Sequence, residues 1–172
     1  MKKGILKNIL YVFLGIIVLG TFGCTQGGEL QSLLWADYKV VGDGSGDQMV
    51  PSLTNTATGK FSANYNIELN SMTYTLRWAN LWVNTGIKDT IVKAGFYSPA
   101  AKGENGTAVR SIYIPTTKLL NPTDSTTYAI AGTKEAFNEK EEADLLNGKW
   151  YYVIHTKKFP NGIVRGQLSA SK

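Results

Sequence analysis

The sequence is poor in the side chains that carry most redox and hydrolytic chemistry. Its 172 residues include one cysteine, Cys24, and one histidine, His155. A single cysteine cannot form an internal disulfide, and zinc or copper sites normally need two or more imidazole or thiolate ligands. A Ser-His-Asp triad would need His155 beside a nucleophile, and the chain has no G-x-S-x-G motif. We therefore predict no catalytic residues, no metal site and no cofactor.

Charged residues are also few, at 18% of the chain, although the formal net charge is +5. Lys2, Lys3 and Lys7 account for much of that excess, and they precede any folded region. No basic stripe remains of the kind that nucleic-acid-binding proteins use, so we expect no nucleic-acid partner. Hydrophobic residues make up 43% of the chain and aromatic residues 11%, which is typical of a globular protein rather than a disordered one.

The sequence also lacks an apolar run long enough for a typical membrane-spanning helix, which needs about 20 residues. The uncharged run Ile9–Phe22 is shorter and follows a basic N-terminus, so residues 1–23 are predicted to be a signal peptide. The segment before Cys24 resembles the signal of bacterial lipoproteins, in which the cysteine is acylated and becomes the first mature residue. Thr21 stands where that signal usually has leucine.

Cys24 is therefore predicted to carry lipid and to hold the protein in a membrane of the cell envelope. The outer membrane or the cell surface is expected, with the protein on the periplasmic or extracellular face. Each buried methylene of an acyl chain contributes about 0.8 kcal/mol to such an anchor. Residues 24–32 are predicted to be the lipidated N-terminus and a tether, and residues 33–172 the folded domain. An uncleaved signal anchor with an incidental cysteine is the alternative.

Period-two hydrophobic patterns predict that this domain is all-β. Lys60–Leu69 has apolar residues at alternate positions, which is typical of a half-buried strand, and Met72–Trp78 is predicted to pair with it. Lys149–Thr156 and Ile163–Leu168 are predicted to form a second hairpin, since Asn161-Gly162 suits a tight turn. Shorter strands are predicted over 33–41, 91–97, 107–114 and 128–131.

One short helix is predicted near 134–147. Asn138 and Glu141 have the spacing of an N-terminal capping box, and Gly148 is placed to end the helix. Loops are predicted over 42–47 and 116–127 from their composition. The first of these has aspartates at calcium-like spacing, but it lacks the glutamate that would complete an EF-hand.

Several segments resemble the CHRD domain family, which is named for chordin and is common in secreted bacterial proteins. Gly148–Leu168 follows the family's C-terminal signature, G-K-W-Y-Y-V-I-H-T-x-x-F-P-x-G-x-x-R-G-Q-L. Val50-Pro51, Ala57-Thr58-Gly59 and Met72–Leu81 resemble further family segments. The resemblance implies an immunoglobulin-like or superoxide-dismutase-like β-sandwich, mainly antiparallel, and it implies no known enzymatic activity.

The same comparison singles out one face of the domain. Many family members resemble A-H-I-H where this chain has Ala94-Gly95-Phe96-Tyr97, and they often have asparagine where it has Val153. The resemblance therefore implies that a polar site on this face has been replaced by apolar and aromatic groups. His155, Arg165 and Gln167 remain as a candidate polar cluster, for binding or for structure. We expect His155 to be structural, with its ring nitrogens bonded within the sheet.

The sequence therefore favours a non-enzymatic binding or scaffolding module whose ligand the sequence does not identify, with a protein and a glycan as the candidates. The alternatives are a metal-binding or enzymatic protein with a superoxide-dismutase-like fold, or a glycan-binding module. Trp78 and Trp150 lie on predicted apolar faces and are expected in the core. Trp82 is expected to be the exposed aromatic residue, on which a sugar could stack.

Overall fold

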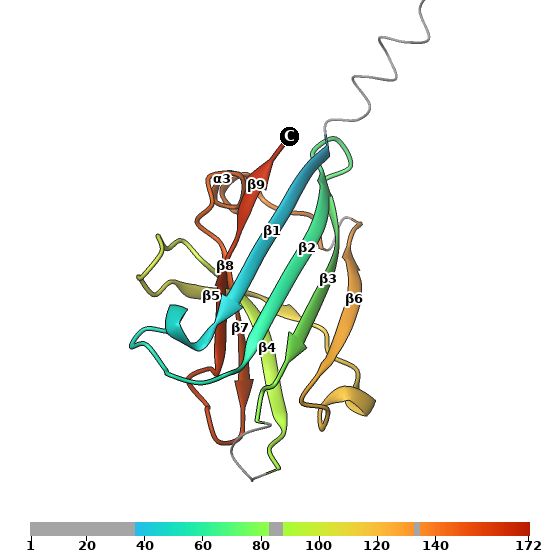
Figure 1. The fold of residues 1–172 in the computed structure, drawn as a ribbon. Coiled ribbons are helices and arrows are strands. Elements are labelled where there is room, and N and C mark those ends of the chain that lie inside the picture. Colours follow the sequence, from blue (N-terminus) through green and yellow to red (C-terminus); the bar gives the residue numbers. More distant parts are fainter. Residues whose placement is uncertain (1–36, 83–87, 133–134) are drawn as a thin grey trace, which may run out of the picture. The chain divides into compact units, whose positions relative to one another are not determined.

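The computed structural model describes residues 37–82, 88–132 and 135–172 (Figure 1). Ala36–Lys172 forms one compact unit. The predicted signal peptide, Cys24 and the tether lie outside the described residues, as do positions 33–36 of the first predicted strand. Within the described part of the chain, no helix is long and apolar enough to span a membrane.

Nine strands in the described residues form one antiparallel sheet, which confirms the all-β prediction. The strands are β1 (Asp37–Ser45), β2 (Thr58–Asn66), β3 (Ser71–Ala79), β4 (Ile91–Ser98), β5 (Thr107–Ile112), β6 (Asp124–Ile130), β7 (Tyr151–Thr156), β8 (Val164–Gln167) and β9 (Ser169–Ser171). The described helices are α3 (Glu139–Leu146) and two 3-10 helices, η1 (Gly46–Gln48) and η3 (Thr116–Lys118). The strand order is β5-β4-β7-β8-β1-β2-β3-β6, and β9 pairs with β1.

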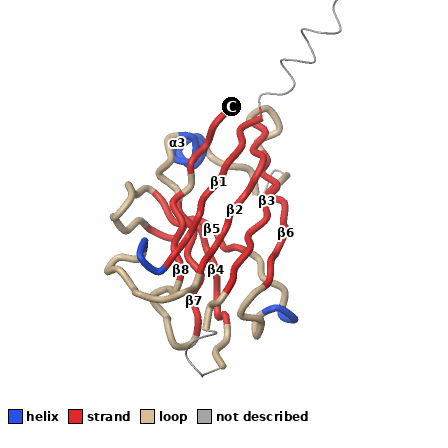
Figure 2. The backbone as a smooth tube through the Cα atoms, viewed as in Figure 1, coloured by secondary structure: helices blue, strands red, loops and turns tan. Residues whose placement is uncertain are grey.

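The sheet curls so that its two halves face each other (Figure 2). An aromatic core lies between them. We call β1, β2, β3 and β6 the front layer, and β5, β4, β7 and β8 the back layer. Phe61 of the front layer contacts Phe96 of the back layer with ring centroids 5.6 Å apart. β1 pairs with β8 at Ser45 and Arg165, which joins the layers at one side. At the other side, the Thr126 hydroxyl donates to the Tyr113 carbonyl at 2.9 Å.

Tyr152 lies in the core between the two layers. Gly44, Gly59 and Gly166 surround its side chain, from β1, β2 and β8 respectively. A Cβ atom added to these glycines would lie 2.4, 2.5 and 2.4 Å from the nearest Tyr152 atom. Real Cβ atoms do not approach that closely, so the three glycines make the space that the tyrosine fills. Burial of its hydroxyl raises the pKa of Tyr152.

The same constraint explains why one predicted loop is wrong. Residues 42–45 belong to β1 rather than to a turn. A Cβ atom at Gly42 would lie 2.6 Å from the Gln167 carbonyl oxygen, so this glycine also permits close packing. Composition alone does not distinguish a glycine that makes room from a glycine that turns the chain.

The predicted hairpins are confirmed, with small shifts at their ends. Phe61, Ala63 and Tyr65 of β2 are buried, and Met72 and Tyr74 of β3 pack on the same side.

Two other strand boundaries, the end of β2 and the start of β6, differ from the predictions by three and four residues. Leu69 lies in the turn after β2 and is 74% exposed, so the predicted strand was too long. β6 begins at Asp124, inside the predicted loop 116–127, because residues from Asp124 onward pair with β3.

The helix is shorter than predicted at its N-terminal end. Asn138 and Glu141 form the expected capping box, and Gly148 follows with a positive φ of 68°. Residues 135–137 do not join the helix, because other side chains bind their backbone. Asn70 accepts from the Phe137 amide and donates to its carbonyl, while Arg110 donates to the carbonyls of residues 135 and 136.

Gly59→Ala is expected to destabilise the domain by about 1–3 kcal/mol, the usual cost of overpacking. The new methyl group would overlap the Tyr152 hydroxyl, which is the atom nearest to the added Cβ position. Adding Tyr152→Phe to Gly59→Ala should recover part of the loss, because it removes that hydroxyl. Chemical denaturation followed by tryptophan fluorescence measures both effects.

The control is Ser62→Ala, an exposed position on the same strand. It should change the unfolding free energy by less than about 0.5 kcal/mol. A Gly59→Ala variant as stable as Ser62→Ala would show that the packing around Tyr152 is looser than described.

Candidate functional site

The predicted polar cluster lies on the outer face of β7 and β8. Along β7, Tyr152 and Ile154 point into the main core, so Tyr151, Val153 and His155 share the opposite face. Cross-strand pairing puts Val153 opposite Arg165, and Tyr151 opposite Gln167. The sheet register therefore brings the three predicted residues, His155, Arg165 and Gln167, to one face.

β4 adds its own outward-facing residues to this surface. Gly95 pairs with Val153, and Tyr97 pairs with Tyr151. Gly95 and Tyr97 occupy the positions at which the family resemblance led us to expect histidines in other members. The Tyr97 and Tyr151 rings stack with centroids 5.3 Å apart. The site thus has an aromatic wall that the polar-cluster prediction did not include.

His155 is buried and has a hydrogen-bond partner at each ring nitrogen. Nδ1 lies 2.9 Å from the Pro160 carbonyl oxygen, and Nε2 lies 2.8 Å from the Tyr97 hydroxyl. Because a carbonyl oxygen can only accept, Nδ1 carries the hydrogen, and in the neutral ring Nε2 accepts from Tyr97. Burial lowers the pKa of His155, and the nearby Lys93 lowers it further, against the opposing effect of the Pro160 carbonyl. His155 is therefore a neutral group that ties Tyr97 to the turn after β7.

Arg165 is a buried cation without a carboxylate partner among the described residues. Its side chain is 1% exposed, and its guanidinium carbon lies 3.7 Å from the centre of the Tyr151 ring. It donates to Asn105 Oδ1 at 3.5 Å, to the Ala101 carbonyl at 3.4 Å and to Gln167 Oε1 at 3.3 Å. These bonds are long, since charge-assisted bonds are commonly about 2.7–2.9 Å. Burial lowers the pKa of Arg165.

Gln167 holds the surrounding backbone in place. Its side-chain nitrogen, Nε2, donates to the carbonyls of Ala100, Gly148 and Trp150 at 3.0, 2.8 and 3.1 Å. An amide has two hydrogens for these three acceptors, so its donors are fully used. Gln167 thus has a structural role, and its side-chain oxygen also accepts a hydrogen bond from Arg165.

A cavity of about 280 Å³ lies between this face and two loops. One loop contributes Met49–Pro51 and the other contributes Asn105 and Gly106. Tyr97, Tyr151, His155 and Arg165 are among the side chains that line it. The cavity combines a buried cation, a hydroxyl group and an aromatic wall, which suits recognition of a small polar ligand.

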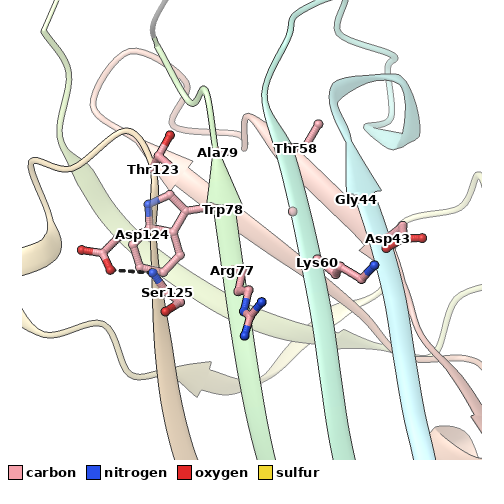
Figure 3. A pocket seen from close by; sticks show the side chains of 11 residues that line it. Asp43, Gly44, Thr58, Lys60, Arg77, Trp78, Ala79, Thr123, Asp124 and Ser125 are labelled. Carbon is pink, nitrogen blue, oxygen red and sulfur yellow. Dashed lines mark hydrogen bonds between the residues drawn. The ribbon is translucent and has the colours of Figure 1, made fainter.

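A larger groove of about 600 Å³ lies on the front layer (Figure 3). Asp43, Lys60, Arg77 and Ser125 pair in a row across its four strands. Lys60 and Arg77 are exposed and directly opposite each other, so their charges repel but remain solvated. Ordering such exposed, solvated cations costs more on binding than using a cation already held in place, as the buried Arg165 is. We therefore take the smaller cavity as the candidate site.

Asp124, which lines this groove, forms an ion pair with Lys118. Their charged atoms lie 3.0 Å apart. Hydrogen bonds from Asn121, Ser125 and Lys118 lower the pKa of Asp124 to about 2, so it stays ionised at neutral pH.

The prediction that Trp82 is exposed was wrong. Its side chain is 8% exposed and joins the core, as Trp78 and Trp150 do. The chain turns after β3 at Asn80, which has a positive φ of 58°, and Leu81 and Trp82 both become buried. A strand pattern would have placed these consecutive residues on opposite faces, and the turn breaks that pattern. Trp82 therefore does not provide the exposed ring that sugar stacking would need.

Among the residues that the structure describes, no group of three or more histidine, cysteine or acidic side chains could hold a metal ion. Three of the four acidic residues of α3, Glu141, Glu142 and Asp144, have protein partners instead. Arg110 forms an ion pair with Glu141, and the Tyr65 hydroxyl donates to Glu142 at 2.6 Å.

The lowered pKa of His155 predicts that the domain loses stability as the pH falls. The unfolded chain takes up a proton near the ordinary histidine pKa of about 6.5, whereas the folded chain resists protonation to a lower pH. The unfolding free energy should therefore fall below about pH 6.5 and level off below the folded pKa. Since His155 is the one histidine of the chain, His155→Gln should remove this step.

The measurement is chemical denaturation of both proteins, without a histidine tag, between about pH 7.5 and 5.5. His155→Gln should be less stable than the wild type at the upper pH, because it disturbs the bonds to Tyr97 and Pro160. Equal pH slopes in the two proteins would contradict the assignment of His155 as a buried neutral group.

Comparison with known proteins supports the resemblance seen in the sequence. No curated protein matches the chain, and no solved structure matches it. A family model for the CHRD domain matches residues 42–168, which extend from β1 through β8 and contain the cavity-lining residues named above. On this match, the chain belongs to the CHRD domain family.

Proposed function

We propose that this CHRD protein is a lipid-anchored binding module of the bacterial cell envelope, without catalytic activity. The observation that carries the binding role is the cavity beside Arg165. Tyr97, His155 and Arg165 are held by neighbouring side chains and backbone, so these three groups are in place before any ligand binds. Preformed cavities with a few fixed polar groups are typical of ligand sites.

The chemistry of the cavity favours binding over catalysis. His155 uses both ring nitrogens in structural hydrogen bonds, which leaves neither free to act as a base toward a ligand. Its partner Tyr97 is a poor nucleophile, because burial and the neighbouring Tyr151 raise the pKa of its hydroxyl. The site can therefore offer hydrogen bonds and a positive charge, but it lacks an activated nucleophile.

The proposed anchor rests on the N-terminal sequence. A basic start, a short apolar run and Gly23-Cys24 support acylation of Cys24 and retention on the outer membrane or the cell surface. The membrane is then one partner of the protein, and the proposed ligand of its domain is a small molecule, or a compact group of a protein or glycan, that fits the cavity beside Arg165. The burial of Trp82 removes the residue on which the glycan-binding alternative depended.

Mass spectrometry of the protein extracted from membranes should show a chain that begins at Cys24 and carries acyl groups. Cys24→Ser should lose the acyl mass, because it removes the thiol that accepts the lipid. Thr21→Leu should increase the processed fraction, since it restores the leucine usual at that position. A wild-type protein that keeps residues 1–23 and carries no lipid would contradict the anchor and favour a signal anchor instead.

Metal analysis of the purified protein distinguishes the binding module from the metal-protein alternative. We expect no stoichiometric copper or zinc in the wild type, because a single imidazole rarely holds either ion. His155→Ala should then show the same metal content. Stoichiometric metal in the wild type that disappears in His155→Ala would instead support a metal protein.

A further inference from the structure

We propose that the cavity beside Arg165 binds the carboxylate of a small organic molecule, with the guanidinium group of Arg165 as its counter-charge. The inference rests on the proposed binding role of this cavity and names the chemical class of the ligand. Arg165 and the Tyr97–Tyr151 pair are the groups that recognise it, and Asn105 competes with it for the guanidinium.

Arg165 is a buried cation with no counter-charge among the described residues. Arg165 is 1% exposed, and none of the ion pairs among the described residues includes it. Buried charges in proteins are normally paired, because removing them from water is costly. The face of the Tyr151 ring compensates part of that cost through a cation–π contact. An anion in the cavity would supply the compensation that is still missing.

The geometry shows where an anionic oxygen would bind. Arg165 makes its longest hydrogen bond, 3.5 Å, with Asn105 Oδ1. Asn105 is exposed on a loop, and its amide nitrogen donates to the Val50 carbonyl at 3.3 Å, which links the two loops over the cavity. The amide oxygen of Asn105 thus occupies a position facing the guanidinium, where a carboxylate oxygen would bind more strongly.

The shape and lining of the cavity favour a carboxylate on a small apolar body. A guanidinium group presents paired N–H donors in a plane, which match the two oxygens of a carboxylate. Beside the cation lie the stacked Tyr97 and Tyr151 rings, with Met49 and Val153 adding apolar surface. The volume of about 280 Å³ is at the small end for ligand sites, which limits the bound part to a compact group.

Benzoate is the test ligand, and benzamide is its uncharged control of the same shape. The full-length chain, without a histidine tag, is titrated in a non-ionic detergent while NMR follows the ring protons of His155. Because the chain contains one histidine, which lines the cavity, these signals report on the site directly. We expect benzoate to shift them in a saturable way, with benzamide and inorganic phosphate producing no saturable shift.

A pair of variants at Asn105 tests the role of the counter-charge without removing Arg165. Asn105→Asp places a carboxylate facing the guanidinium, so it should stabilise the fold and weaken benzoate binding at least about tenfold. Asn105→Ala loses the same bond to Val50 but adds no charge, so it should keep benzoate affinity or increase it. Arg77→Gln, which removes an exposed cation on β3, should leave the affinity unchanged.

Three results would overturn the proposal. These are a benzoate titration like that of benzamide, saturable binding of phosphate without benzoate, or wild-type benzoate affinity in Asn105→Asp. None of them affects the acylation of Cys24, which mass spectrometry measures separately. If the protein is lipidated but does not bind benzoate, the proposed lipid anchor stands and the proposed carboxylate ligand is rejected.

Discussion

The close approach of the two layers around Tyr152 is the constraint on which the rest of the domain depends. Three strands have glycine beside Tyr152, at Gly44, Gly59 and Gly166, and the absence of side chains there lets the Tyr152 ring fill the space between the layers. This packing lets the curled sheet enclose a dense aromatic core, in which Phe61 contacts both Phe96 and Tyr152. Larger residues at the glycine positions would push the layers apart and open the core.

The same packing determines what the outer face can offer. Because Tyr152 points inward, strand alternation turns Tyr151 and Val153 outward, and pairing with β8 then places Arg165 beside them. A one-residue shift of β7 would move Tyr152 to the outer face and leave the core unfilled. The core therefore fixes the register that assembles the cavity, and a substitution in the core can disturb the site without contacting it.

Much of this arrangement was predictable from local patterns, and the failures have physical causes. Alternation identified the buried faces of β2 and β3, and the capping box of Asn138 identified the start of α3. The predictions failed where a distant contact overrides a local pattern. Gly42 serves close packing instead of a turn, Asn80 turns the chain so that Trp82 is buried, and Asn105 reaches Arg165 from a loop whose sequence gives no sign of it.

The charge on the outer face of β4, β7 and β8 depends on Gly95 and Tyr97, which lie where the family resemblance suggested histidines. With Gly95 and Tyr97 there, His155 has a phenol hydroxyl as its partner and remains neutral, so it contributes no charge to the cavity. Arg165 is then the dominant charge at the site, and its burial prevents water from screening it. The exposed pair Lys60 and Arg77 has more charge in a larger groove, but solvent weakens its field. A desolvated cation beside aromatic rings is thus the stronger determinant of what this domain can bind.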